Sequence, residues 1–440
     1  MRVAGKHGRS VIFYLYQIIG AFVDGDILHF RVGAGWRRGR NRVPSMERGD
    51  LVLQLSPQCP LHKPISGANI ILSLNESFLQ RSLWNGLRAN GSQPSAVITS
   101  VLPETVGFYT SLNLMLCGFN VHGIGSSPKW ISRVERAILE AVERQRRLHK
   151  EWVGRTGRFI AHVCDMSNLV SVSNLCTALL RDTNIRVIIC NAEAKESLEA
   201  SSSHDLDGQF TVRYVSQSLL LLRLLQHRLV EAKVLSSPCP HWRIVVVTCS
   251  SAGMADSLVE RMFNCSHEEP AAGSGLHSFR ARSNAEMSRL LFGFALSKFV
   301  ASEPRLAPFC SVNIVQSDML SEMVNLNADL SHQSSFLRRV FSLFSLSPVV
   351  AALHVTDVCL GKRVENMNGH YFRMGEDVTA ISEQMQEDAK ARMGCLANSP
   401  LFNGVPKPAI SLSREKQKNV WICTLSHLVS RTFLKAKVFY

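Results

Sequence analysis

The 440-residue sequence contains no Cys-x-x-Cys pair and no His-Glu-x-x-His motif, although it has 12 cysteines and 15 histidines. Without these spacings the common zinc and redox motifs are excluded, and we expect no metal site. Most of the cysteines lie inside apolar runs, as Cys117, Cys164, Cys190 and Cys249 do. Cysteines in such runs favour buried thiols in a reducing, intracellular compartment over disulfide pairing.

Long apolar runs are scarce near the N-terminus, where the longest covers residues 11–23. Its roughly 13 residues fall short of the ~20 that a helix needs to span a bilayer. Three cations precede the run, as in a signal peptide, but Asp24 and Asp26 follow it in place of a clear cleavage site. Three interpretations stay open: a helix packed on the folded domain, an anchor on a membrane surface, or a cleaved targeting segment.

Charged residues are also few, at 19% against 46% hydrophobic residues, which allows a sizeable core and excludes a wholly disordered chain. The formal charge of +14 sits mainly at the two ends of the chain. Nine basic and four acidic residues give +5 in residues 1–50, and seven basic and one acidic residue give +6 in residues 407–440. We therefore expect an anionic surface, such as a membrane, to meet these ends. The ends lack the interleaved aromatics of nucleic-acid-binding segments, so no nucleic-acid partner is expected.

From about residue 94, short apolar runs alternate with amphipathic stretches. The runs contain many β-branched residues, which favours strands buried on both faces of a sheet. They cover residues 96–99, 120–124, 159–163, 187–190, 244–248 and 311–315. Residues 130–150 place apolar side chains on one helical stripe, and residues 215–235 are apolar enough for a buried helix. This alternation predicts an α/β fold with a doubly wound, Rossmann-like parallel sheet that binds ligands at the carboxyl ends of its strands.

The length of 440 residues exceeds that of a typical single domain, and the patterns divide it into three parts. Residues 1–93 form an N-terminal extension, and residues 94–375 form the Rossmann-like domain. Residues 376–440 are expected to form a C-terminal helix, at about 377–396, followed by a basic tail.

Local motifs between about residues 94 and 400 occur in the order found in the short-chain dehydrogenase/reductase family. The sequence most resembles the retinol-dehydrogenase-like branch of that family. The motifs lie at residues 96–110, 117–121, 163–172, 188–192, 243–253 and 368–372. The resemblance implies a Rossmann-like domain, an NAD(P) cofactor, and hydride transfer between the nicotinamide and a carbonyl or alcohol. Residues 1–93 and 401–440 fall outside the resemblance.

The resemblance assigns cofactor-binding positions to Thr99, Gly107, Asp165, Asn191 and Ala192. A glycine-rich loop normally lets backbone N–H groups approach the cofactor pyrophosphate. Of the glycines in the family pattern Thr-Gly-x-x-x-Gly-x-Gly, only Gly107 is kept, and Pro103 removes a backbone donor. Glu104 and Glu193 add negative charge near the expected phosphates. These substitutions disfavour cofactor binding, and Asp165 fits equally well as a cap of the following helical turn.

The family reaction uses a tyrosine as general acid/base, with its pKa lowered by a lysine, together with a serine and an asparagine. Ser250 matches the serine, whereas Arg213, Arg282 and Glu286 stand at the asparagine, tyrosine and lysine positions. Arginine keeps its proton at neutral pH, so Arg282 cannot exchange one. Arg282 and Glu286 are spaced to form a salt bridge on one helix face. An exposed pair would contribute only ~0.3–0.5 kcal/mol, whereas a buried pair would occupy the nicotinamide site.

These observations leave two functions open. The first is a family member that has lost hydride transfer and acts as a binding or scaffold protein, with a protein or a membrane surface as its partner. The alternative is a divergent NAD(P)-dependent oxidoreductase acting on a carbonyl or alcohol of a lipid-like substrate. Either would be intracellular, in the cytoplasm or on a membrane. The resemblance also implies a homodimer through the helices at 215–235 and 284–300, although burial in the core explains their apolarity equally well.

Overall fold

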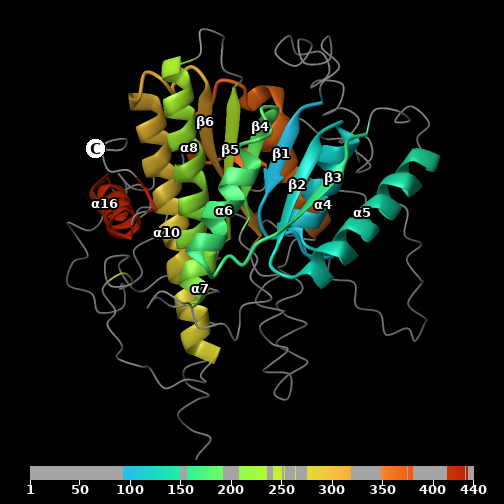
Figure 1. Ribbon diagram of the computed structural model, residues 1–440, viewed down its shortest axis with the longest axis horizontal. Coiled ribbons are helices and arrows are strands. Elements are labelled where there is room, and N and C mark those ends of the chain that lie inside the picture. The colour runs from blue at the N-terminus through green and yellow to red at the C-terminus, as the bar shows by residue number, and fades with distance from the viewer. Residues whose placement is uncertain are drawn as a thin grey trace, which may run out of the picture. The chain divides into compact units, whose positions relative to one another are not determined.

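A twisted sheet of eight strands forms the centre of the computed structural model, in the order β3-β2-β1-β4-β5-β6-β7-β8 (Figure 1). Strands β1 to β7 run parallel, and β8 pairs antiparallel with β7. The parallel strands are β1 Ser95–Ile98, β2 Asn120–Gly125, β3 Phe159–Val163, β4 Ile185–Cys190, β5 Trp242–Cys249, β6 Cys310–Asp318 and β7 Tyr371–Arg373, and β8 is Glu376–Asp377. The strand order reverses between β1 and β4, which confirms the predicted doubly wound, Rossmann-like fold.

The structure describes residues 93–148, 156–191, 208–234, 241–249, 252, 263, 275–318, 348–373, 375–379, 414–431, 433 and 434. All of them belong to one unit of the chain, Val52–Tyr440. The predictions made for residues 11–23, and for the rest of residues 1–92, lie outside the described residues.

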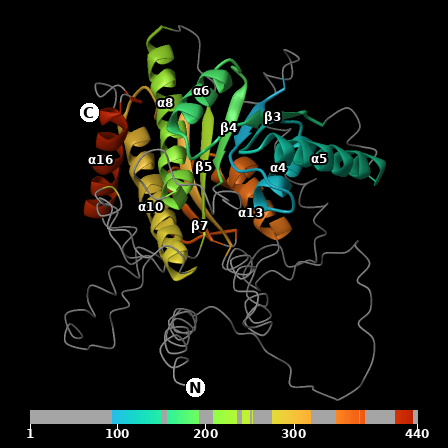
Figure 2. The same cartoon turned by 60° about the horizontal axis from the view of Figure 1, so that its bottom comes forward.

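Helices cover both faces of the sheet and close two hydrophobic cores. One face carries α6 Leu169–Leu179, α8 Ser216–Val234 and α10 Gly275–Ser302, which lie in front of the sheet in Figure 1. The other face carries α4 Val106–Leu116, α5 Pro128–Leu148 and α13 Pro348–Leu360, and Figure 2 shows this group on the opposite side of the strands. The predicted helices at 130–150 and 215–235 correspond to α5 and α8. All six predicted strands are present as β1 to β6.

Short helical turns and caps set where the longer helices begin. The side chain of Thr105 accepts a hydrogen bond from the Phe108 N–H and so caps α4. Asn168 caps α6, because its Oδ1 accepts from the Val170 N–H at 2.9 Å and from the Ser171 N–H at 3.3 Å. A short helix α7, Gly208–Phe210, leads into a π-helical turn η2, Thr211–Val215, and η2 continues directly into α8. A 3-10 turn, η4 Lys362–Val364, follows α13.

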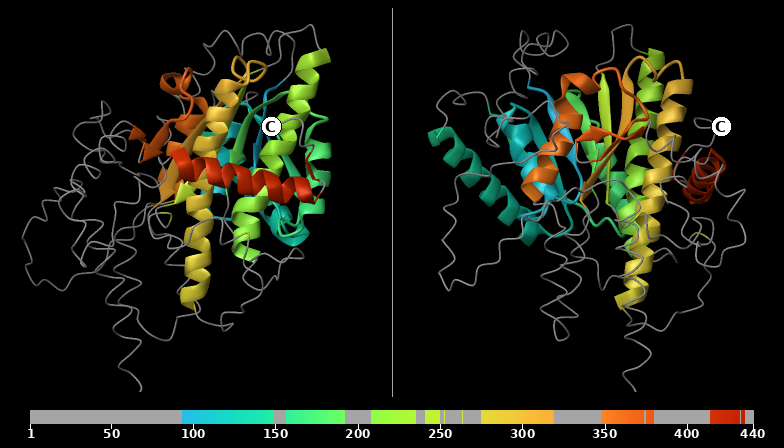
Figure 3. Two further views of the ribbon diagram at one scale, coloured as in Figure 1. Left: turned by 90° about the vertical axis from the view of Figure 1, so that its left-hand side faces the viewer. Right: turned by 180° about the vertical axis from the view of Figure 1, so that it is seen from behind.

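The C-terminal region differs from the prediction in two places. Asp377 lies in β8 and not in a helix, and residues 380–396 of the expected helix lie outside the described residues. A helix that the sequence analysis did not predict, α16 Arg414–Ser430, packs on α10 (Figure 3). The cations of this segment suggested a solvated tail. However, its apolar residues Val420, Leu425 and Leu428 are all buried in the hydrophobic core that also includes residues of α8 and α10.

Among the described residues, no helix has the length and apolarity that crossing a membrane requires. They also hold no group of three or more His, Cys, Asp or Glu side chains arranged to bind a metal ion.

Candidate functional site

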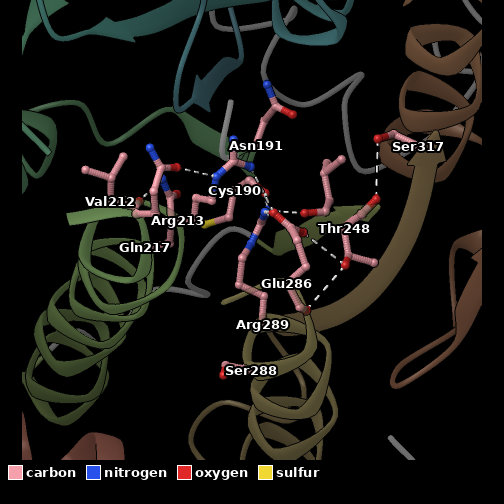
Figure 4. Close-up of polar contacts among 12 residues, drawn as sticks. Cys190, Asn191, Val212, Arg213, Gln217, Thr248, Glu286, Ser288, Arg289 and Ser317 are labelled. Carbon is pink, nitrogen blue, oxygen red and sulfur yellow. Dashed lines mark hydrogen bonds and ion pairs between the residues drawn. The ribbon is translucent and has the colours of Figure 1, made fainter. Parts of the chain in front are cut away.

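A buried cluster of charged side chains lies between the carboxyl ends of β4 and β5 and the helices η2 and α10 (Figure 4). Arg213 from η2 donates from Nη1 to Glu286 Oε1 at 3.2 Å. Arg289, one turn after Glu286 on α10, donates from Nη1 to both carboxylate oxygens, at 3.0 and 3.1 Å. Thr248 of β5 donates from Oγ1 to Glu286 Oε2 at 3.2 Å. Glu286 therefore stands between two guanidinium groups and a hydroxyl.

Hydrogen bonds from the cluster also connect the ends of β4 and β5 to α10. Arg289 donates from Nη2 to the carbonyl oxygen of Cys190 at 2.8 Å and to that of Val247. These two residues lie at or near the carboxyl ends of β4 and β5. In Rossmann-like folds this edge of the sheet is where ligands bind. Here protein side chains fill part of it.

Burial of the cluster is nearly complete. The side-chain exposures are 4% for Arg213, 2% for Glu286 and 3% for Arg289. Buried charges are stable only when they are paired and hydrogen-bonded, and this carboxylate meets that condition. Arginine cannot release its proton at neutral pH. The cluster therefore holds charges in place and offers no proton shuttle of the kind that hydride transfer to a carbonyl needs.

The structure brings together two of the four predicted catalytic positions. Arg213 and Glu286 are in contact, and Arg282 is buried on the same helix, with 7% of its surface exposed. Ser250 lies outside the described residues. Arg282 and Glu286 are both buried, and the ion pairs described for Glu286 run to Arg213 and Arg289.

Sequence reasoning missed two members of the cluster, Arg289 and Thr248. Arg289 stands three residues after Glu286, a spacing that places both side chains on one helix face, so the signal was present. Thr248 gave no signal, because its contact depends on how α10 packs on β5.

The loop between β1 and α4 has an unusual backbone at two positions. Ser100 and Glu104 both adopt the left-handed backbone region, with φ of 56° and 60°, which favours glycine. Val101 and Leu102 of this loop are buried, and Val101 belongs to the core on the α4 side of the sheet. The Thr105 hydroxyl donates to the Leu102 carbonyl at 2.7 Å and also caps α4, so protein atoms satisfy the start of this helix.

Three of the predicted cofactor-binding residues lie together beside this loop. The Asn191 N–H donates to Thr99 Oγ1 at 2.9 Å, and Asn191 Nδ2 donates to the Ser100 carbonyl at 3.4 Å. A Cβ added to Gly107 would lie 2.8 Å from Asn191 Nδ2 and 2.9 Å from the Ser100 carbonyl oxygen. Gly107 is thus required for close packing between α4 and the ends of the strands, which is one of the roles of glycine in dinucleotide loops.

The other two predicted cofactor-binding residues do not join this group. Asp165 is exposed after β3, where its Oδ1 accepts from the N–H and the hydroxyl of Ser167 at 2.9 and 2.7 Å. This is the turn-capping role that the sequence left open, although the helix itself is capped by Asn168. Ala192 lies outside the described residues.

None of the described tyrosines is prepared for acid/base catalysis. Burial raises the pKa of Tyr214 and of Tyr371, and burial together with the charge of Glu104 raises the pKa of Tyr109. A catalytic tyrosine in this reaction needs a pKa that a neighbouring cation lowers. The lysine of α10 that the structure describes, Lys298, donates instead to Gln417 of α16 at 2.7 Å.

No protein-family model matches the sequence, and no curated protein matches it. Among solved structures, the chain resembles actinorhodin polyketide ketoreductase with NADPH, with 13% identity and a TM-score of 0.44 over 64% of this chain and 98% of that one. It also resembles L-sorbose reductase from Gluconobacter frateurii, complexed with NADPH and L-sorbose, with 12% identity and a TM-score of 0.43 over 64% and 95%. A third is a 3-oxoacyl-[acyl-carrier protein] reductase from Brucella melitensis, with 14% identity and a TM-score of 0.39 over 64% and 96%. Similarity at this level does not assign a family or an activity to the chain.

Proposed function

We propose that the chain is a member of the short-chain dehydrogenase/reductase family that no longer transfers hydride and serves as a binding or scaffold protein. The strand order of the sheet and the order of the sequence motifs support the family. The retinol-dehydrogenase-like branch rests on the sequence motifs alone.

The observation that carries this proposal is the buried cluster of Arg213, Glu286 and Arg289. Two of its members stand at the asparagine and lysine positions of the family reaction. With an arginine also at the tyrosine position, Arg282, the charges beside the nicotinamide site are the reverse of those that catalysis needs. A lysine that lowers a tyrosine pKa is replaced by a carboxylate that holds two guanidinium groups.

The alternative, a divergent NAD(P)-dependent oxidoreductase acting on a lipid-like carbonyl or alcohol, draws on a different observation. The backbone of Ser100 and Glu104 keeps the left-handed conformation that suits a pyrophosphate-binding loop. Thr99, Gly107 and Asn191 also lie side by side next to this loop. A cofactor bound here would meet the exposed carboxylate of Glu104, which favours the first function over this one.

Cofactor titration separates the two functions. NADH and NADPH are titrated into the full chain up to millimolar concentration, and binding is read from nicotinamide fluorescence. The binding or scaffold function predicts no saturable signal for either cofactor. Saturation in the micromolar range would overturn it and support the oxidoreductase.

A designed variant makes a negative result informative. In this variant Ser100→Gly and Glu104→Gly place glycine at the two left-handed loop positions and leave the buried cluster of Arg213, Glu286 and Arg289 intact. We expect this variant to bind NADPH more tightly than the unaltered chain. Turnover of a retinal-like or short aldehyde by the unaltered chain would contradict the proposed loss of hydride transfer.

The partner that we propose for a scaffold function is a protein or an anionic membrane surface that meets the basic ends of the chain. Arg414 and Lys418 on α16 are exposed cations in this region. Sedimentation with phosphatidylserine vesicles tests the membrane, and binding that persists at high salt would contradict an electrostatic attraction to the lipid.

A further inference from the structure

Strand β3 is the outermost strand at one end of the sheet (Figure 1). It pairs with β2, and no described strand lies on its other side. An edge strand of this kind presents unpaired backbone groups that another strand can use.

The backbone groups that β3 offers outward can be identified from those that face β2. The Val121 N–H donates to the Arg158 carbonyl at 2.7 Å, and the Cys164 N–H donates to the Gly125 carbonyl at 2.9 Å. Since residues along a parallel strand alternate in the direction of their backbone groups, residues 160 and 162 also face β2. Phe159, Ala161 and Val163 therefore point their N–H and carbonyl groups away from the sheet.

The edge also exposes apolar side chains and lacks the features that protect edges in monomers. Ile160 is 37% exposed and Val163 is 53% exposed. Between Phe159 and Val163 there is no lysine, proline or acidic residue. Natural edge strands usually carry charges, prolines or bulges that prevent pairing with another chain. This strand is open to pairing on both its backbone and its side chains.

We propose that two copies of this chain pair through β3, antiparallel and about a two-fold axis at Ala161. In this register Ala161 pairs with the partner's Ala161, and Phe159 pairs with the partner's Val163. All of these residues have outward backbone groups, so each pair exchanges two hydrogen bonds. The exposed Val163 side chain meets the partner's Phe159, and Ile160 meets the partner's His162.

The two-fold axis makes each of these contacts twice, as an isologous interface requires. His162 fits beside an apolar side chain because burial and the nearby His122 lower the pKa of His162 to about 4, so that it is uncharged at neutral pH.

The proposed interface differs from the helices that the family resemblance implied for a homodimer. Part of α10 is covered by α16 of the same chain, with the Trp421 ring 5.8 Å from that of Phe292 and 5.1 Å from that of Phe299 (Figure 3). The β3 edge carries no such described cover. The inference is independent of the proposed loss of hydride transfer, because it uses no residue of the charged cluster.

Analytical ultracentrifugation of the full chain tests the proposal. We expect a dimer in the micromolar range that Ala161→Pro disrupts, because proline removes an outward N–H and leaves the bonds to β2 intact. Val163→Lys places a charge at the interface and should weaken the dimer at least about tenfold. Val230→Lys is the matched control, since Val230 on α8 is 54% exposed and lies outside the interface. A monomeric full chain, or a dimer that survives Val163→Lys with unchanged affinity, would overturn the proposal, and circular dichroism checks that each variant is folded.

Discussion

Arg213 and Glu286, which are 73 residues apart in the chain, form a buried ion pair with 3.2 Å between Nη1 and Oε1. The pair joins the π-helical turn η2 to α10, and π-helical turns are frequent at functional sites. A buried pair of this kind is a poor source of net stability but is costly to break. Its value here lies in how firmly it holds charge at a site where the fold normally places a cofactor.

Removing the carboxylate of the cluster should strongly destabilise the fold. Glu286→Gln leaves Arg213 and Arg289 buried without their shared negative charge, and we expect a loss of about 3–5 kcal/mol in the free energy of unfolding. Urea denaturation followed by circular dichroism measures this loss. The control is Glu143→Gln, which breaks an exposed pair with Arg147 and should cost less than about 0.5 kcal/mol. Equal losses in the two variants would show that the cluster does not carry the stability assigned to it.

Glycine should stabilise the β1–α4 loop where the backbone is left-handed. Ser100→Gly and Glu104→Gly each remove a side chain from that conformation, and we expect each to add about 0.5–1 kcal/mol to the free energy of unfolding. Thermal denaturation provides the measurement. Ser132→Gly, in the interior of α5, is the contrasting variant and should cost about 0.5 kcal/mol. Destabilisation by both loop substitutions would mean that the Ser100 and Glu104 side chains hold the loop through contacts.

Stability should fall as the pH is lowered from about 6.5 to about 4. Burial, followed by the charge of His122, lowers the pKa of His162 to about 4, and burial with the charges of Arg243 and Arg228 lowers that of His241 to about 4. The folded chain therefore takes up these protons less readily than the unfolded chain, whose histidines titrate near 6.5. The contribution of these histidines to stability is complete above about pH 6.5, the pKa in the unfolded chain. It is lost as the pH falls toward about 4, the pKa in the folded chain.

Urea unfolding at a series of pH values checks this prediction. His162→Gln cannot titrate, so its stability should depend less steeply on pH between about 6.5 and 4 than that of the unaltered chain. A variant with the same pH dependence as the unaltered chain would remove His162 from the explanation.

The docking of α16 should depend on Trp421. Its ring stacks on that of Phe292 on α10. The Phe292 ring also contacts the ring of Tyr214, and the Tyr214 hydroxyl forms a hydrogen bond with the Thr424 hydroxyl of α16. Trp421→Ala should cost about 3 kcal/mol and increase proteolysis within residues 414–430. Ile422→Ala is the neighbouring control, because Ile422 is 41% exposed and should change stability by less than about 0.5 kcal/mol. A trypsin cleavage pattern that Trp421→Ala leaves unchanged would contradict this role.

The sequence predicted the sheet well because its strands carry a local signal. Runs of β-branched and apolar residues such as 187–190 and 244–248 are long enough to be read directly, and their alternation with helices implies parallel strands. The prediction failed at α16, because the cations of residues 407–440 suggested a solvated tail. The apolar stripe of Val420, Leu425 and Leu428 acquires meaning only beside α10, which precedes it by more than a hundred residues.

In the candidate site too, part was predictable from the sequence and part depended on the tertiary structure. The identities of Arg213, Arg282 and Glu286 belong to the sequence, and an arginine keeps its proton at neutral pH in any fold. The partners of Glu286 were decided by tertiary structure. The spacing to Arg282 was as suitable as the spacing to Arg289, and only the packing of η2 and β5 against α10 brought Arg213 and Thr248 to the carboxylate. Charge composition belongs to the chain, whereas the pairing of buried charges depends on which distant segments the fold places in contact.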